Sequence, residues 1–176
     1  MDLVLVISAK LFLAAVLAIG ALKKLNSLGT FETALKGFSL IPNALSRPLA
    51  YGVPFSEAAI AIALLVPVIS YSAALAALGL MVLYAALMMV ALTQSSNPFD
   101  CGCNWGKAKT SAHPFMLIRN GILLVAALVA AAPQTTRALG WFDGMNIFFS
   151  VAALLALYAT LEALLALPSF QHRRHS

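Results

Sequence analysis

Charged residues are scarce in this sequence: only 10% of its residues are Asp, Glu, Lys or Arg, whereas 62% are hydrophobic. In soluble domains, about a quarter of all residues are charged. A mean hydropathy of +0.94 therefore excludes an ordinary soluble domain and indicates an integral membrane protein. A chain of 176 residues has room for four or five spanning helices of roughly 20 residues each. We predict a single all-α membrane domain over residues 1–176.

Acidic residues are fewer still, six against eleven Lys and Arg, which gives a net charge of +5. The basic residues lie mostly beside apolar runs, where they orient helices in the bilayer, so we expect no nucleic-acid binding. No basic leader precedes the first apolar run and no small-x-small site ends it, so we expect no cleaved signal peptide. We expect a multi-pass protein of a bacterial-type cytoplasmic (inner) membrane.

Five apolar runs are long enough to be membrane spans. They cover residues 3–22, 51–69, 73–92, 115–132 and 145–167. Between the first two, residues 30–41 form an amphipathic segment with one apolar stripe that includes Phe31 and Leu35, and Pro42 and Pro48 end it. The pattern predicts a bundle of four to five transmembrane helices with an interfacial helix after the first span.

Cysteine is nearly absent, and the two that occur, Cys101 and Cys103, are separated only by Gly102 in a polar loop over residues 93–114. Such a pair can close into a disulfide, share a soft metal ion, or be inert. A disulfide across so short a loop must fit a narrow range of Cα separations, and strain makes it easier to reduce. The pair therefore favours exchangeable redox chemistry over a structural role.

The neighbours of the cysteines influence how readily they ionise. Lys107, Lys109 and His113 favour the reactive thiolate, while Asp100 opposes it. Trp105 either anchors the loop at the membrane surface or covers the thiols.

Four charged residues interrupt the predicted spans. If the spans alternate in direction, Arg119 lies roughly 6 Å, Glu162 about 8 Å and Glu57 about 10 Å below the surface that carries the cysteine loop. Lys10 lies deeper. Because a charge that faces lipid is costly, we predict a polar pocket below the cysteines, with Glu57 paired to Lys10 or Arg119 and with Asn120 beside them.

Several of these polar residues also have a purely structural interpretation. Arg119 can extend its guanidinium to the interface, and Glu57 can form a purely structural ion pair. Glu162 and the Lys23-Lys24 doublet are assigned to the interface. Met81, Met88 and Met89 are interpreted as packing residues.

Four motifs carry a family resemblance: Phe31 to Pro42, Pro54-Phe55-Ser56-Glu57, Asp100-Cys101-Gly102-Cys103 with Gly106, and Arg119-Asn120. Taken together, they make the chain resemble the MauE/DoxX-like redox-associated membrane proteins, named for a component of methylamine utilisation. The resemblance extends over most of the chain. It implies a helical bundle that assists disulfide formation or maturation of an extracytoplasmic client protein, in company with a thioredoxin-like protein. Asn104, which precedes Trp105-Gly106, is a small departure from the family pattern.

Two arguments disagree about the side of the membrane on which the cysteines lie. The cysteine side holds eight Lys and Arg, including Lys23, Lys36 and Arg47, whereas the other side has only Arg137. The positive-inside rule therefore predicts a cytoplasmic cysteine loop. The disulfide chemistry implied by the resemblance favours the outside.

Two chemical functions and one structural function follow from the sequence. The first is a thiol-disulfide oxidoreductase, in which Arg119 stabilises a thiolate and Glu57 handles protons or positions a lipid-soluble acceptor such as a quinone. The second is a carrier of Cu(I) or a similar soft metal ion held by Cys101 and Cys103. The third is a membrane maturation factor without chemistry of its own.

Overall fold

The computed structural model describes residues 1–36, 42–93, 114–133 and 138–165. These residues form six helices and no strand. Four of the helices, α1, α3, α4 and α6, are long and apolar enough to cross a membrane, and α5 is a shorter apolar helix. The prediction of an all-α membrane protein is confirmed. The helices are α1 (Leu3–Asn26), α2 (Leu28–Lys36), α3 (Asn43–Leu65), α4 (Ser70–Thr93), α5 (Pro114–Ala130) and α6 (Trp141–Leu165).

Helix α1 begins at a clear cap and runs further than the predicted span. The Asp2 side chain accepts a hydrogen bond from the Val4 amide at 3.2 Å, which satisfies one of the free donors of the first turn. The helix ends at Asn26, and the amide of the capping residue Ser27 donates to the Lys24 carbonyl. Lys23 and Lys24 occupy the last turn, where a positive charge interacts favourably with the negative end of the helix dipole. The first span was predicted to end at residue 22, before these lysines.

Helix α2 is the amphipathic helix expected after the first span. Its buried residues, Phe31 and Leu35, pack with Ala50 of α3, so the apolar stripe faces protein. On the other side, the Lys36 ammonium lies 2.7 Å from the Glu32 carboxylate and its hydrogen bond lowers the pKa of Glu32. The predicted segment continued to residue 41, and residues 37–41 lie outside the described part of the chain.

Helix α3 begins at Asn43 and contains both Pro48 and Pro54. The sequence analysis took Pro48 as the end of the preceding helix and began the span at residue 51. Transmembrane helices accept proline because neighbouring groups can satisfy the freed carbonyls, so Pro48 does not end α3. The helix stops at Leu65 because Val66 precedes Pro67 and is extended, with φ −91° and ψ 111°.

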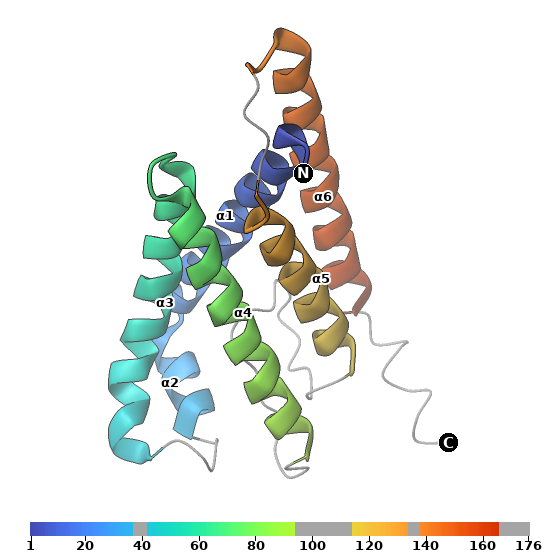
Figure 1. Cartoon of the computed structure of the whole chain (residues 1–176). Helices are drawn as coiled ribbons and strands as arrows, with labels where there is room; N and C mark the ends of the chain where they lie inside the picture. Colours follow the sequence, from blue (N-terminus) through green and yellow to red (C-terminus); the bar gives the residue numbers. More distant parts are fainter. Residues whose placement is uncertain (37–41, 94–113, 134–137, 166–176) are drawn as a thin grey trace.

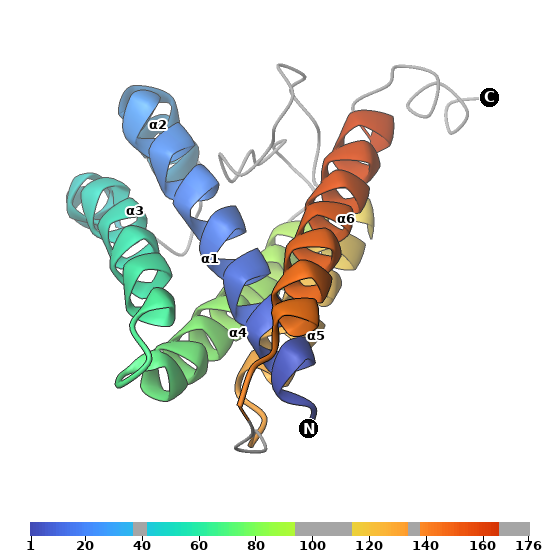
Figure 2. The ribbon, with the colours of Figure 1, turned by 90° about the horizontal axis from the view of Figure 1, so that it is seen from above.

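The spans alternate in direction, which is the condition on which the predicted depths depend. α1, α4 and α6 end, and α3 and α5 begin, at the lower end of Figure 1. We call this the α4–α5 end. At the opposite end, the Met1 amino group donates to the Pro133 carbonyl at 2.8 Å, and α3 turns into α4. Figure 2 shows the helices from that opposite end.

Helix α1 is the centre of the bundle, because α3, α5 and α6 all pack against it. Its buried face carries Phe12, Leu13 and Leu17 into the main apolar core. Helix α6 packs mainly on α1, over a narrow seam that includes Tyr158, and most of its other described side chains are exposed. Such a wide apolar exterior suits contact with lipid.

Candidate functional site

The predicted redox residues lie in the segment that joins α4 to α5. Asp100, Cys101, Gly102, Cys103 and Trp105 all fall outside the described residues. The helix ends that flank the segment, Thr93 and Pro114, are both at the α4–α5 end of the bundle.

Glu57 is the centre of a buried polar cluster formed by three helices. Its side chain on α3 is almost fully buried. The Lys24 ammonium, from the last turn of α1, donates to Glu57 Oε1, and the Tyr84 hydroxyl of α4 donates to the same oxygen. Lys24 Nζ also lies 3.4 Å from the Tyr84 oxygen. We call Lys24, Glu57 and Tyr84 the Glu57 cluster.

Aromatic and small residues enclose this cluster. Lys24 Nζ lies 5.0 Å from the centre of the Tyr84 ring and 5.7 Å from that of Phe31, so α2 contributes a ring over the ammonium. Both distances allow a cation–π attraction. A Cβ atom at Gly20 would come within 3.8 Å of Glu57 Oε2, which shows how closely α1 approaches the carboxylate. Four helices therefore meet at one buried ion pair.

The partner of Glu57 differs from the prediction, which paired it with Lys10 or Arg119. Lys24 was assigned to the interface because it follows a long apolar run directly. The sequence did hold a signal for its burial: Lys24 lies seven residues after Leu17, close to two helical turns, and so extends the same buried face. The helix continues past it, and Phe31 then covers it.

Lys10 occupies a separate place in the fold. Its ammonium donates to Ser70 Oγ at 3.1 Å, and Ser70 Oγ donates to the Pro67 carbonyl at 3.1 Å. Lys10 and Lys24 are fourteen residues apart on α1, or about 21 Å along the helix. Lys10 thus lies at the α3–α4 turn near the carboxyl end of α3, where the helix dipole favours a cation.

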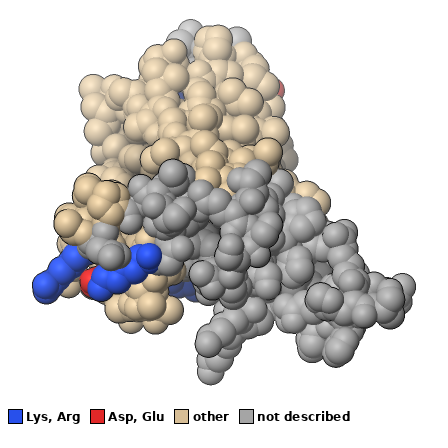
Figure 3. All heavy atoms as spheres, turned by 90° about the horizontal axis from the view of Figure 1, so that it is seen from below, with Lys and Arg blue, Asp and Glu red and all other residues tan. Residues whose placement is uncertain are grey.

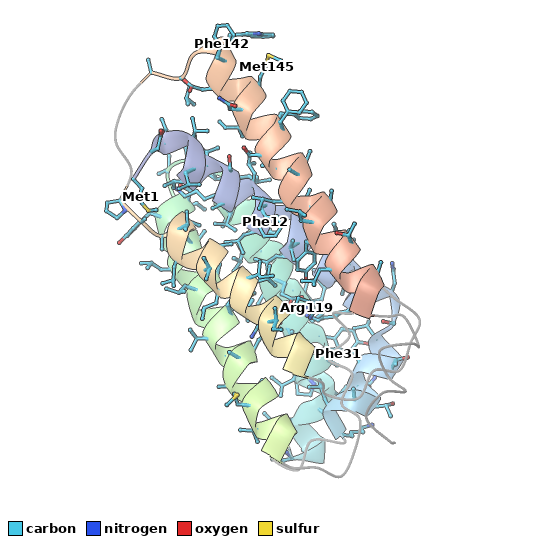
Figure 4. The ribbon with its side chains drawn as sticks, turned by 90° about the vertical axis from the view of Figure 1, so that its right-hand side faces the viewer. Met1, Phe12, Phe31, Arg119, Phe142 and Met145 are labelled. Carbon is cyan, nitrogen blue, oxygen red and sulfur yellow. The ribbon has the colours of Figure 1, made fainter. Side chains whose placement is uncertain are left out.

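Arg119 and Asn120 are buried on α5, as their place in the predicted pocket requires. Asn120 Nδ2 donates to the Met81 carbonyl of α4 at 3.4 Å, and Met81 lies one turn before Tyr84 on the same helix. This bond fixes Asn120 close to the level of the Glu57 cluster. Figure 4 shows Arg119 and Phe31 toward the end of the bundle that lies away from Met1.

The buried charges near the α4–α5 end come from three helices, α1, α3 and α5. Among the described residues, Lys24 and Arg119 are buried cations in this region and Glu57 is the buried carboxylate. The described residues contain no group of three His, Cys, Asp or Glu side chains that could hold a metal ion.

A comparison with protein families matches residues 1–133 to the model described as "Methylamine utilisation protein MauE". The chain belongs to the MauE family. It is 30% identical to the methylamine utilization protein MauE of Paracoccus denitrificans over 165 residues, which cover 88% of this chain and 89% of that protein. The MauE of Paracoccus versutus is 33% identical over 159 residues, covering 90% and 86%. No solved structure matches.

The MauE match includes the whole Glu57 cluster, both cysteines, Arg119 and Asn120, and it ends before α6 begins. With its apolar helices, this MauE-family chain is a multi-pass membrane protein.

Proposed function

We propose that this MauE-family protein is a membrane thiol-disulfide redox protein that exchanges electrons between the Cys101/Cys103 pair and a thioredoxin-like or client protein. The observation that carries the proposal is the spacing of the only two cysteines, one residue apart, in the segment between α4 and α5. Because its relatives are named for methylamine utilisation, we infer a client in that system, whose disulfide formation or maturation the protein assists.

The exchange balances with two co-reactants, the client dithiol and the disulfide of a thioredoxin-like protein. To oxidise a client, one client thiolate attacks the Cys101–Cys103 disulfide, forms a mixed disulfide and releases one cysteine as a thiolate that takes up a proton. The second client thiolate then attacks the mixed disulfide and releases the other cysteine. The client gains one disulfide, and the pair receives two electrons and two protons. A thioredoxin-like disulfide restores the pair by the reverse sequence.

The buried charges support this chemistry in two ways. Arg119 lies on the first turns of α5, directly after the cysteine segment, and its positive charge would stabilise a thiolate. The Glu57 cluster joins α1, α3 and α4 and, through Phe31, α2. We propose that it holds the end of α4 in place and that Glu57 exchanges protons with the redox reaction.

The position of the basic residues supports a cytoplasmic α4–α5 end in the inner membrane. Lys23, Lys24, Lys36 and Arg47 all belong to helix ends at this side of the bundle. Figure 3 shows charged side chains of the described residues gathered at one edge of this end. Basic residues are retained on the cytoplasmic side during insertion. On that side the pair would pass reducing equivalents to a partner, the reverse of client oxidation, because client disulfides persist only outside a reducing cytosol.

The test is a thiol count on the purified full chain after controlled oxidation and reduction, with metal analysis of the same sample. We expect two thiols after reduction and none after oxidation, with the chain still monomeric on a non-reducing gel. Cys101→Ser and Cys103→Ser should each abolish client maturation, and one of them should accumulate a mixed disulfide with a partner.

Two results would contradict the redox proposal. A pair that never oxidises and retains one soft metal ion per chain would indicate a metal carrier. Unchanged client maturation in the Cys101→Ser/Cys103→Ser double variant would indicate a maturation factor that needs neither thiol.

A further inference from the structure

A basic rim lies where α2 packs on α3, at the α4–α5 end of the bundle. Leu35 and Ala50 belong to the apolar cluster that joins the two helices. Lys36 is the next residue on α2, and Arg47 lies about one turn before Ala50 on α3, so both basic side chains come to the same edge. Both are exposed. Figure 3 shows Lys and Arg side chains gathered around an acidic one at an edge of this end. We call Glu32, Lys36 and Arg47 the α2–α3 rim.

The two cations of the rim are held differently. The Lys36 ammonium lies 2.7 Å from the Glu32 carboxylate. Its hydrogen bond is the main cause that lowers the pKa of Glu32, and the charge of Arg47 adds to the effect, which places Arg47 near the same carboxylate. Within the described part of the chain, no hydrogen bond or ion pair holds the Arg47 guanidinium. Its planar fork of donors therefore remains available for an anion, and a phosphate matches that geometry.

Beyond Arg47, one face of α3 is apolar and exposed. The residues 4, 8, 15 and 18 positions after Arg47 lie within about 80° of it around a helix of 3.6 residues per turn. From Arg47 to the last of them is about 27 Å, close to the roughly 30 Å thickness of the hydrocarbon core, so Arg47 lies at the level of the lipid head groups. These residues are Tyr51, Phe55, Ile62 and Leu65, with exposed fractions of 44%, 60%, 65% and 57%.

The apolar face of α3 leads to a groove with room for a hydrocarbon chain. Ile62 and Leu65 line a groove of about 660 Å³ between α1, α3 and α6, and Ala14, Ala18 and Ala21 of α1 are among the small residues that line it too. A soluble anion would contact only the charges of the rim. A phospholipid would contact the charges with its head group and the apolar face with a chain.

We propose that the α2–α3 rim binds the phosphate of an anionic diacyl phospholipid, with Arg47 and Lys36 donating to the phosphate and one hydrocarbon chain along the exposed face of α3. Basic side chains at a membrane surface attract anionic lipids, and arginine adds paired hydrogen bonds to a single phosphate. A head group without a cation, as in phosphatidylglycerol, suits the rim better than phosphatidylcholine, whose choline is repelled by the same side chains.

The lipid site is independent of the proposed thiol chemistry. It uses neither cysteine, and it makes no assumption about the side of the membrane on which the rim lies. The Cys101→Ser/Cys103→Ser variant should therefore bind the lipid as the native chain does. Either proposal can fail without the other.

The experiment uses the full chain, delipidated in a neutral maltoside detergent, and native mass spectrometry that counts bound lipid during titration with 1-palmitoyl-2-oleoyl-phosphatidylglycerol. Phosphatidylcholine with the same two chains is the reference lipid. We expect saturable binding of phosphatidylglycerol and an affinity about fivefold weaker for phosphatidylcholine, the effect of one basic side chain on an anionic head group.

Three variants locate the site. Arg47→Gln should weaken the affinity for phosphatidylglycerol about fivefold. Glu32→Gln should strengthen it about two- to fivefold, because the Lys36 ammonium then loses its competing carboxylate. The matched control is Lys23→Gln, which removes one positive charge at the same end of the bundle but from the last turn of α1; its affinity should equal that of the native chain. Circular dichroism of each variant checks that the helices are retained.

Three outcomes would overturn the proposal. Equal affinities for phosphatidylglycerol and phosphatidylcholine would remove the anionic head group from the site. Equal weakening by Arg47→Gln and Lys23→Gln would show attraction by overall charge only. Displacement of the lipid by glycerol 3-phosphate as effective as by phosphatidylglycerol would assign the rim to a soluble phosphate and leave the apolar face of α3 without a role.

Discussion

At the scale of single residues, Glu57 is distinctive because two donors from different helices share one of its carboxylate oxygens. Ion pairs buried away from water carry a large desolvation cost, so they stabilise a fold only when the charges are paired and hydrogen-bonded. Lys24 and Tyr84 meet that condition for Oε1. The pair also makes α1 dependent on α3, since neither charge tolerates the loss of the other.

The first prediction concerns this dependence. Glu57→Gln leaves the Lys24 ammonium buried without a carboxylate, and we expect it to lower the free energy of unfolding by about 3–5 kcal/mol. The double variant Lys24→Met/Glu57→Gln removes both charges and should recover most of the loss. Thermal unfolding in detergent, followed by circular dichroism, measures both. Equal losses in the single and double variants would show that Lys24 and Glu57 do not depend on each other.

A second prediction isolates the Tyr84 hydroxyl. Tyr84→Phe keeps the ring beside Lys24 but removes a hydrogen bond to a charged acceptor, and we expect a loss of about 1.5–3 kcal/mol in the same assay. Tyr71→Phe is the matched control, because Tyr71 lies on the same helix with an exposed side chain. The prediction fails if both substitutions lower the unfolding free energy by the same amount.

Sequence reasoning identified part of this site. The burial of Glu57, Arg119 and Asn120 followed from the cost of placing polar side chains in lipid, which holds for any bundle. The choice of Lys24 over Lys10 did not follow, because the depth of a residue in the membrane does not specify which face of its helix it occupies. That choice depends on the extension of α1 to Asn26 and on the position of Phe31, both of which are tertiary features.

At the scale of elements, α2 is the helix least able to fold alone. It has nine residues, and isolated helices shorter than about 12–15 residues are marginal in water. Its two buried residues, Phe31 and Leu35, pack with Ala50 of α3. Its stability therefore depends on tertiary packing.

The third prediction tests that dependence. Phe31→Ala removes the larger of the two buried side chains and the ring over Lys24, so amide exchange over residues 28–36 should accelerate while the buried part of α4 is unaffected. Hydrogen–deuterium exchange with mass spectrometry measures this directly. Thr33→Ala is the control, because Thr33 is exposed on the same helix. Identical exchange in the two variants would contradict a packing role for Phe31.

Element boundaries show where local rules stop applying. Pro67 ended α3 as a proline should, through the extended residue before it. Pro48 did not, since it lies within the first turns of α3, beside the buried Ala50 that receives α2. The same residue type has opposite effects at the two places because packing supports the helix at one and a turn follows at the other.

At the scale of the whole molecule, the two ends of the bundle differ in their share of basic residues. Apolar periodicity and the alternation of spans were enough to predict which helix ends lie together, because a chain that crosses a bilayer must return on the other side. Neither feature tells the two ends apart. Lys23, Lys24, Lys36 and Arg47 do, and all four belong to the α4–α5 end.

The last prediction is the orientation that follows from this difference. After treatment with an impermeant reductant, Cys101 and Cys103 should react with a membrane-impermeant maleimide in inverted vesicles and stay unmodified in spheroplasts. The control is Ser72→Cys on a Cys101→Ser/Cys103→Ser background, which places one thiol at the α3–α4 turn and should give the reverse pattern. If instead the native cysteines react from outside and the Ser72→Cys thiol does not, the basic residues do not determine the topology. The thiol pair would then face the oxidising compartment in which client disulfides persist.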